Sequence, residues 1–322
     1  MTTTRRAFLT TAACATASFA APIRAFAQRK SPFKVAVITD EISNDFDHAC
    51  SVAANEFGMG WVELRNLWGK GVVDLKSDDV ARAQAILTKY NLRVTDIASP
   101  LFKVDWPGAP LSKERSRGGR TLDPVKAAAD YKKQDDVLAA SIEMAKQFQT
   151  DKVRCFDFWK LDDQPPYRAA IDEKLQSAAE TAKKQGVVLV LENEPACNTA
   201  TGPDAARVLA AVPGIFLNWD PGNAALVGET DVYPTGWDML PKNRILHCHC
   251  KNVVADAQGK RGWSPVDVGY VDWAAQFRAL KAAGYRNAVS LETHWTGGGT
   301  PEASSRISWA GMKKSLVAAG AF

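Results

Sequence analysis

Residues 187–195, with the sequence VVLVLENEP, constrain the fold of this chain more than any other stretch. The apolar and largely β-branched run from Val187 to Leu191 indicates a strand buried on both faces, as in a parallel sheet. The run stops at Glu192, and Pro195 excludes further strand pairing. Because (β/α)8 barrels keep their chemistry at the carboxyl ends of buried parallel strands, Glu192 is expected to be a functional carboxylate.

Three later segments repeat this pattern. IFLNWDPGN contains Asp220, ILHCHCKN contains His249 and AVSLETHW contains Glu292. One such residue alone would be interpreted as a solvated loop residue, but four at successive strand ends favour a shared site. Without a cation, three clustered carboxylates would repel one another and their pKa values would rise. We therefore expect Glu192, Asp220, His249 and Glu292 to bind one divalent ion, with Mn²⁺, Mg²⁺ or Co²⁺ favoured and Zn²⁺ as an alternative.

Hydrophobic periodicity in the rest of the chain predicts eight strands that alternate with helices. The expected strands are 34–40, 60–65, 93–99, 152–159, 187–191, 215–220, 245–252 and 288–294. The expected helices are 46–57, 77–90, 136–148, 167–185, 201–212, 235–240, 272–283 and 301–319. This order predicts an α/β fold with a single (β/α)8 TIM barrel. An open doubly wound sheet is disfavoured, because no Gly-rich phosphate loop follows the first strand.

Residues 100–124 form the longest segment without a predicted element and contain four prolines and the adjacent glycines Gly118 and Gly119. Long loops in compact domains are usually lids or disordered segments. The position of this segment after a strand favours a lid over the active face, and a disordered surface insertion is the alternative.

The first 27 residues are expected to be a removed export signal. Thr4–Leu9 (TRRAFL) resembles a twin-arginine motif, and Ala25-Phe26-Ala27 is a potential cleavage site. The apolar run 10–21 is short and rich in Ala and Thr, which argues against a stable membrane anchor. We therefore expect the barrel to occupy residues 28–322 and the twin-arginine export machinery to deliver the protein to the periplasm.

Charge and cysteine content exclude two other classes of protein. Removal of three arginines and no acid with residues 1–27 lowers the formal net charge from +4 to about +1, which gives no basis for nucleic-acid binding. Five irregularly spaced cysteines remain, which argues against a disulfide framework. Cys248 and Cys250 alternate with two histidines, so they are expected to point to the outer layer of the barrel. The sequence does not indicate an oligomeric state.

Several segments together resemble the sugar phosphate isomerase/epimerase family, which has a xylose isomerase-like barrel. These segments are TDEIS, VELRNLWGKGV, IASPLF, LENEP, WDPGN, HCHCKN, VDVGYVDW and SLETHW. The resemblance extends from about Phe33 to the C-terminus. It implies that Glu192, Asp220, His249 and Glu292 bind the metal, and that Glu192 and Glu292 form the acid/base pair. The second histidine of the H-x-H motif is the one that matches the family.

Further residues near the strand ends are candidates for substrate binding. They are Glu63, Arg65, Lys251, Asn223 and His294. Glu63 and Arg65 share one strand face and could instead form a buried ion pair. Lys251 matches the family lysine near the substrate, and Asn223 stands where many relatives have histidine. His294 is expected either to contact substrate or to support Glu292.

The leading interpretation is a metal-dependent isomerase or epimerase that acts on a ketose or related sugar through an enediolate. A lyase or hydrolase acting on 3-keto-glycosides at the same metal site is the alternative. A non-catalytic periplasmic sugar-binding protein is a further alternative, although binding alone would not need both Glu192 and Glu292. The three-zinc site of apurinic endonucleases requires many histidines, and this chain has four.

Overall fold

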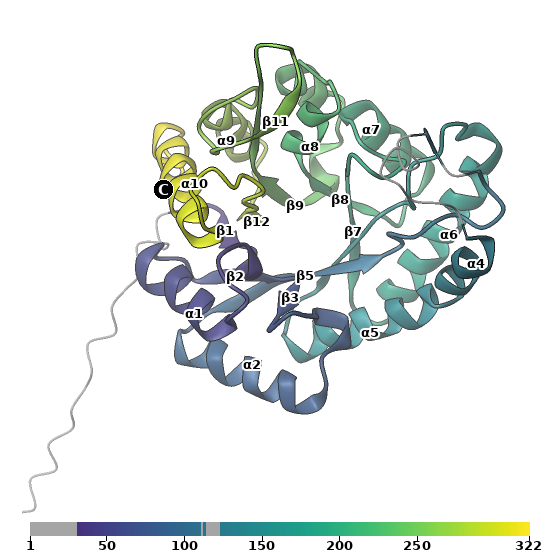
Figure 1. Ribbon diagram of the computed structural model, residues 1–322, viewed down its shortest axis with the longest axis horizontal. Helices are drawn as coiled ribbons and strands as arrows, with labels where there is room; N and C mark the ends of the chain where they lie inside the picture. The colour runs from purple at the N-terminus through teal and green to yellow at the C-terminus, as the bar shows by residue number, and fades with distance from the viewer. Residues whose placement is uncertain (1–30, 111, 114–122) are drawn as a thin grey trace, which may run out of the picture.

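Eight parallel strands arranged around a barrel form the centre of the molecule (Figure 1). This computed structural model describes residues 31–110, 112–113 and 123–322. The barrel strands are β1 (Lys34–Val37), β2 (Trp61–Leu64), β5 (Arg93–Leu101), β6 (Lys152–Cys155), β7 (Val188–Glu192), β8 (Phe216–Trp219), β9 (Ile245–Cys250) and β12 (Ala288–Leu291). Hydrogen bonds join them in the order β1-β12-β9-β8-β7-β6-β5-β2. An isolated bridge between Ile38 and Glu63 nearly closes the ring, so the predicted TIM barrel is confirmed.

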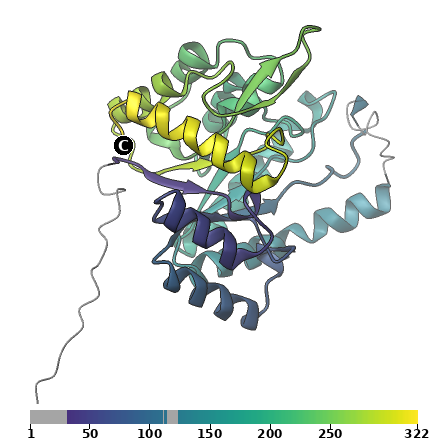
Figure 2. The ribbon, with the colours of Figure 1, turned by 60° about the vertical axis from the view of Figure 1, so that its left-hand side comes forward.

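Helices surround the strands on the outside of the barrel (Figure 1). They are α1 (Phe46–Ser51), α2 (Ser77–Lys89), α4 (Pro124–Lys132), α5 (Gln134–Gln147), α6 (Pro165–Lys184), α7 (Gly202–Ala211), α8 (Pro221–Leu226), α9 (Trp273–Ala282) and α10 (Pro301–Ala318). Helix α10 lies beside α1 on the outer surface (Figure 2), where His48 Nε2 is 2.8 Å from Glu302 Oε2. Within the described residues, the helices are too short or too polar to cross a membrane.

Side chains along each strand alternate between the outer apolar layer and the lumen. In β9, Cys248 and Cys250 belong to the buried apolar core between strands and helices, as predicted. His247 and His249 face the lumen, where they approach Asp96 of β5 and Glu63 of β2. Both histidines are fully buried. The lumen of this barrel is therefore strongly polar, whereas its outer layer is apolar.

The structure corrects two segments near the carboxyl ends of β8 and β9. The short helix α8 follows β8 directly, because Asp220 caps its first turn and Pro221 occupies its first position. A two-stranded hairpin of β10 (Asn252–Ala255) and β11 (Arg261–Ser264) occurs where only a polar loop was expected. Its polar turn has no apolar alternation, so periodicity could not predict it.

Three other boundaries also differ from the prediction. Helix α4 was not predicted; Ala127 is its only buried residue, so little of this short helix packs against the core. Strand β6 ends at Cys155 rather than at residue 159, and Phe158 has a φ of 69°, which is incompatible with an extended strand. Strand β5 continues to Leu101, two residues further than expected. A second small hairpin joins β3 (Asn66–Leu67) to β4 (Lys70–Gly71).

Two expectations fall wholly or partly outside the described residues. The export signal of residues 1–27 lies outside them. Residues 111 and 114–122, which belong to the expected lid of residues 100–124, also lie outside the described residues. Both expectations therefore stay predictions.

A buried carboxylate, Asp157, connects the loop after β6 to the loop after β7. It accepts hydrogen bonds from Thr199 N at 2.9 Å, from Thr199 Oγ1 at 2.7 Å and from both terminal nitrogens of Arg168 at 3.1 and 3.2 Å. Burial raises the pKa of Asp157 to about 6, although Arg168 and Thr199 act in the opposite direction. These contacts hold two loops together at the end of the barrel that carries Glu192.

The raised pKa of Asp157 predicts an unusual pH dependence of stability. The folded state keeps this proton up to about pH 6, whereas an unfolded aspartate releases it near pH 4. The contribution of Asp157 to the free energy of unfolding should therefore fall as pH rises through 6. Relative to Asp157→Asn, the wild type should lose about 1–1.5 kcal/mol between pH 5 and pH 7.5. Urea unfolding followed by tryptophan fluorescence measures this difference, and an opposite slope would show that pairing with Arg168 outweighs burial.

Candidate metal centre

Four residues from consecutive parts of the sheet meet at the carboxyl end of the barrel. Glu192 ends β7, Asp220 follows β8, His249 lies in β9 and Glu292 follows β12. One ligand atom from each of these residues lies within 4.8 Å of the corresponding atoms of the other three. All four side chains are buried. The structure thus brings together the four residues that the sequence selected.

His249 lies at the centre of this cluster. Its Nδ1 is 3.1 Å from Glu292 Oε2, 3.2 Å from Glu192 Oε1 and 3.6 Å from Asp220 Oδ2. Its Nε2 points the other way and is 2.9 Å from Glu63 Oε1. Burial would lower the pKa of His249, but Glu63, Glu292 and Glu192 raise it well above its usual value. The distances show that Nδ1 is the ring atom that faces the three carboxylates.

The sequence around Asp220 sets the position of its carboxylate. Asp220 Oδ1 accepts a hydrogen bond from the backbone N–H of Asn223 at 2.8 Å, as the cap of α8. Asn193 clamps the backbone of Asp220, since it accepts from Asp220 N at 2.8 Å and donates to Asp220 O at 2.7 Å. A Cβ at Gly222 would lie 2.7 Å from Cγ of Lys251, so this position requires glycine. The D-P-G-N segment thus directs Asp220 Oδ2 toward the cluster.

Lys251 contributes a buried cation to the same cluster. Its Nζ lies 2.6 Å from Asp220 Oδ2 and 4.0 Å from Glu192 Oε1, and it also contacts Glu292 Oε2. Burial acts to lower the pKa of Lys251, but Asp220 and Glu292 raise it above its usual value. Lys251 therefore remains an ammonium group beside three carboxylates.

Both predicted acid/base residues are held in the ionised form. Burial opposes ionisation of Glu192, but His249 and Arg154 lower the pKa of this carboxyl below its usual value. Arg154 is lumenal and also forms a salt bridge, with Nη1 3.1 Å from Glu192 Oε2. Burial likewise opposes ionisation of Glu292, while Lys251, His294 and His249 lower its pKa well below the usual value.

Arg65 and His294 lie at the partly exposed rim of the cluster. Arg65 Nη2 is 2.7 Å from Glu41 Oε1 and 2.9 Å from Asp40 Oδ2, and its Nη1 is 3.4 Å from Glu292 Oε1. His294 Nδ1 is 3.3 Å from Glu41 Oε1, and its Nε2 is 3.7 Å from Glu292 Oε1. Their side chains are 25% and 30% exposed, so both could reach a bound molecule.

The other two candidate substrate-binding residues are buried. Asn223 is 1% exposed, and its Nδ2 donates to Glu192 Oε1 at 3.1 Å and to Asn193 O at 2.8 Å. Glu63 is fully buried and faces His249, whereas Arg65 is paired with Asp40 and Glu41. These contacts connect Asn223 and Glu63 to the proposed ligands rather than to the mouth of the barrel.

Sequence reasoning missed several residues of the site. Trp263 on the β10–β11 hairpin packs edge-on against His294, with ring centroids 5.1 Å apart, and its ring centroid is 5.1 Å from Lys251 Nζ. Only the tertiary fold brings this tryptophan over the cluster, because it lies in an expected polar loop. Asp96 and His247 form a deeper pair, with Oδ1 and Nε2 3.0 Å apart. The H-x-H spacing could have placed His247 on the lumenal face with His249.

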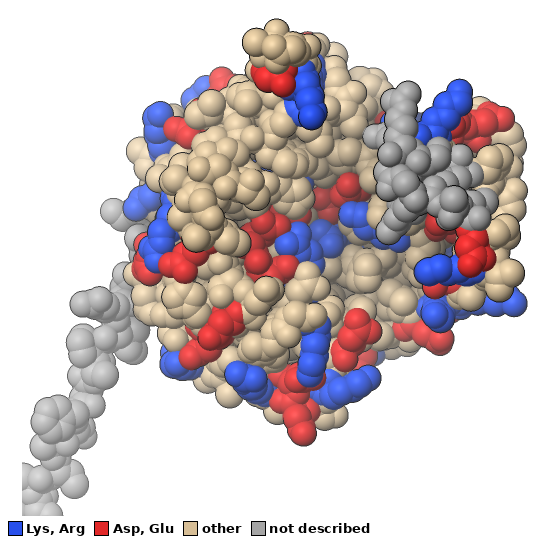
Figure 3. All heavy atoms as spheres, viewed as in Figure 1, with Lys and Arg blue, Asp and Glu red and all other residues tan. Residues whose placement is uncertain are grey.

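The donor set of this centre fits a divalent ion. Three ionised carboxylates and one imidazole nitrogen converge within 4.8 Å. Hard oxygen donors with one imidazole suit Mn²⁺, Mg²⁺ or Co²⁺. Acidic and basic side chains gather around a hollow at the centre of the face seen in Figure 3. The cluster therefore has both the chemistry and the surroundings of a metal site.

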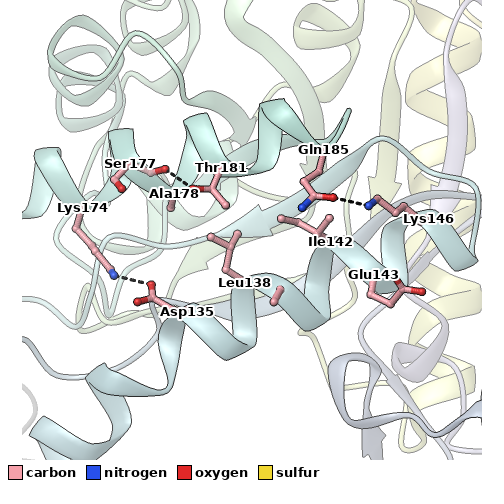
Figure 4. Close-up of a pocket in the computed structure, with 11 residues that line it drawn as sticks. Asp135, Leu138, Ile142, Glu143, Lys146, Lys174, Ser177, Ala178, Thr181 and Gln185 are labelled. Atoms are coloured by element: carbon pink, nitrogen blue, oxygen red, sulfur yellow. Dashed lines mark hydrogen bonds and ion pairs between the residues drawn. The ribbon is translucent and has the colours of Figure 1, made fainter.

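A separate groove lies on the outside of the barrel between α5 and α6 (Figure 4). Its floor includes Leu138 and Ile142, and at one end Lys174 Nζ is 2.7 Å from Asp135 Oδ1. This groove is an opening between two surface helices, and its lining differs from the convergent donor set of the barrel. The donor cluster at the carboxyl end of the barrel is therefore the candidate functional site.

Metal binding should stabilise the folded protein. At a free Mn²⁺ concentration about 100 times the dissociation constant, the melting temperature of EDTA-treated protein should rise by about 5 °C. Asp220→Asn should lose most of this increase, because it removes a charged ligand. His48→Gln, which alters a histidine on the outer surface, should retain it. Differential scanning fluorimetry measures the shift, and an equal shift in Asp220→Asn would show that Mn²⁺ binds elsewhere.

Comparisons with known proteins agree with this geometry. Residues 52–314 match the family model described as xylose isomerase-like TIM barrel. A comparison with curated proteins found no significant match. Many solved structures share the fold.

Three of these structures illustrate the similarity. The probable 3-DHS dehydratase AsbF of Bacillus anthracis is 22% identical, with a TM-score of 0.63 over 88% of this chain and 98% of that one. A xylose isomerase-like TIM barrel protein from Mycobacterium smegmatis, in complex with magnesium, is 15% identical, with a TM-score of 0.63 over 91% and 99% of the two chains. The 3-keto-D-glucoside 4-epimerase YcjR of E. coli is 16% identical, with a TM-score of 0.58 over 88% and 99%. The TM-scores show a common fold, and the family match over residues 52–314 establishes that this chain belongs to the xylose isomerase-like TIM barrel family.

Proposed function

We propose that this protein is a metal-dependent sugar isomerase or epimerase. The observation that carries the proposal is the placement of two ionised carboxylates around one histidine. Glu192 and Glu292 approach His249 Nδ1 at 3.2 and 3.1 Å, from strands that are separated in the sheet by β8 and β9. Of two carboxylates on opposite sides of a bound sugar, one can remove a proton from one face of a carbon while the other donates a different proton to the opposite face.

In this proposal, Glu192, Asp220, His249 and Glu292 hold the divalent ion. When bound, such an ion polarises a carbonyl and stabilises the negative charge of an enediolate. Glu192 and Glu292 then exchange protons with the carbon next to that carbonyl. The carboxylate that faces the hydrogen acts as the base, and the opposite carboxylate takes up a proton from solvent, which it then donates to the other face of the carbon.

The remaining candidates have roles in orienting the sugar. Lys251, whose Nζ lies beside Asp220 and Glu292, can donate a hydrogen bond to a substrate oxygen. Arg65 and His294 at the rim can bind hydroxyl groups. Asn223 holds Glu192 through its Nδ2, 3.1 Å from Glu192 Oε1. Trp263 covers this side of the site with an aromatic face, which suits stacking on a sugar ring.

The relatives support this reaction class. The E. coli protein of similar fold is named as an epimerase of a 3-keto-D-glucoside, and the M. smegmatis protein contains magnesium. A lyase or hydrolase acting on 3-keto-glycosides remains the second candidate, because it would use the same carboxylates and expel a leaving group instead of returning the proton. Trp263 favours a glycoside as much as a free sugar, since an aromatic wall can contact an aglycone or a second ring.

We also propose that the mature barrel comprises residues 28–322 and works in the periplasm after twin-arginine export. The support is the TRRAFL motif and the A-F-A site that precedes residue 28. A small sugar or glycoside is then the partner of the mature protein, and the export machinery is its partner during transport.

The reaction class can be tested by exchange of hydrogen with solvent. In D₂O, the Mn²⁺-loaded protein should incorporate deuterium at a carbon next to the carbonyl in one member of a panel of ketoses and 3-keto-glycosides. NMR of the recovered sugar measures the exchange, and product analysis separates an epimer from a released aglycone. Glu194→Gln is the control, because this neighbouring carboxylate is paired with Lys103 at 3.1 Å instead of with the cluster. Tight sugar binding without any exchange would favour the non-catalytic binding protein.

The two-carboxylate mechanism also predicts that a variant lacking one carboxylate loses interconversion of epimers but keeps solvent exchange of one epimer. In Glu192→Gln, interconversion of epimers should fall at least about 100-fold. The epimer whose hydrogen faces Glu292 should still exchange with solvent, and Glu292→Gln should retain exchange of the other epimer. The metal content of each variant is measured first, so that loss of the ion is recognised. A single variant that interconverts epimers at the wild-type rate would contradict the two-carboxylate mechanism.

A further inference from the structure

Two carboxylate–histidine pairs are stacked in the lumen along β9. In the upper pair, Glu63 Oε1 and Oε2 lie 2.9 and 3.2 Å from His249 Nε2. In the lower pair, Asp96 Oδ1 lies 3.0 Å from His247 Nε2. All four side chains are fully buried, and the two rings are 5.4 Å apart and nearly perpendicular. Glu63 is fully buried behind His249. Its carboxylate is therefore remote from a substrate at the mouth of the barrel.

The upper pair determines which nitrogen of His249 carries a proton. Both carboxylate oxygens of Glu63 face Nε2, and a carboxylate oxygen at this distance accepts a hydrogen bond from an N–H at Nε2. Asn218 Nδ2 also lies 3.1 Å from Nε2, but the carboxylate contact is shorter and charge-assisted. Metal binding requires a neutral imidazole, and with its proton at Nε2 such a His249 presents a lone pair at Nδ1 to the ion. Nδ1 is the atom that faces Glu192, Asp220 and Glu292.

We propose that Glu63 is a positioning residue for the metal centre. It holds His249 in the Nε2–H tautomer, orients the ring and makes Nδ1 a stronger donor to the ion. Carboxylates that hold a metal-binding histidine in this way typically contribute a factor of 10–100 to metal affinity. The inference rests on the proposed metal-dependent function, and it gives Glu63 a role different from the substrate contact expected from the sequence.

The lower pair supplies a matched control. Asp96 is as deeply buried as Glu63 and also bonds a histidine, and its Oδ1 accepts a hydrogen bond from Thr95 Oγ1 at 3.0 Å. His247 and Asn218 lie between Asp96 and the ligand atom of His249, since Asn218 Oδ1 is 3.1 Å from His247 Nδ1. Loss of either carboxylate removes one buried charge, but only loss of Glu63 alters the bond to His249.

The experiment compares the Mn²⁺ affinities of the wild type and its variants. Each full chain is purified and stripped of metal with EDTA, and it is then titrated with Mn²⁺ in competition with a fluorescent chelator. Glu63→Gln should bind Mn²⁺ about 10–100-fold more weakly than the wild type. Asp96→Asn should remain within about threefold of the wild type. Glu63→Asp should recover part of the affinity, because it restores a carboxylate at a greater distance. The melting temperatures of the metal-free Gln and Asn variants should be similar, which separates positioning from a general loss of stability.

A measurement on the wild type keeps the proposal testable if a variant does not fold. In ¹⁵N-histidine NMR of protein loaded with diamagnetic Mg²⁺ or Zn²⁺, His249 should carry its proton at Nε2. A proton at Nδ1, an unchanged affinity in Glu63→Gln, or an equal loss in Asp96→Asn would overturn the proposal. Two ions per wild-type chain would also overturn it, because Glu63 would then be a ligand itself. A wild type that binds no divalent ion would instead refute the proposed function.

Discussion

Repulsion among the carboxylates in the barrel lumen is the constraint on which the rest of the site depends. Glu192, Asp220 and Glu292 each offer an oxygen within a few ångströms of His249 Nδ1. Buried charges of one sign are strongly unfavourable unless cations offset them. Lys251 lies between Asp220 and Glu292 and supplies one such cation. A divalent ion at this point would complete the neutralisation, so the site is built to attract one.

The same constraint accounts for the surroundings of the cluster. Arg154 spans the lumen, with hydrogen bonds to Glu192 and to the backbone oxygen of Ala98 at 3.1 Å each. Arg65 neutralises the outer side through Glu41 and Glu292. Each arginine satisfies more than one partner, which limits the cost of burying its charge. The acidic centre is therefore enclosed by cations on two sides and opens toward the rim that carries Trp263.

Local sequence was a good guide to the barrel and to its charged strand ends, and a poor guide to the loops. The largely apolar runs that precede Glu192, Asp220 and Glu292 all became strands of one sheet, because short apolar runs suit strands that are buried on both faces. Helix α4 and the β10–β11 hairpin have no such signal, since α4 buries a single residue and the hairpin turn is polar. Trp263 was missed with the hairpin that carries it.

The sequence by itself determined the fold class and the four residues that meet at the carboxyl end of the barrel. Strand periodicity and the acidic strand tips are local properties, so they can be recognised without knowledge of the fold. Only the tertiary structure decided how neighbouring charges are paired. Glu63 and Arg65 are two residues apart, yet Glu63 bonds His249 and Arg65 bonds Asp40 and Glu41. Those partners are distant in sequence, and closure of the barrel alone brings them within hydrogen-bonding distance.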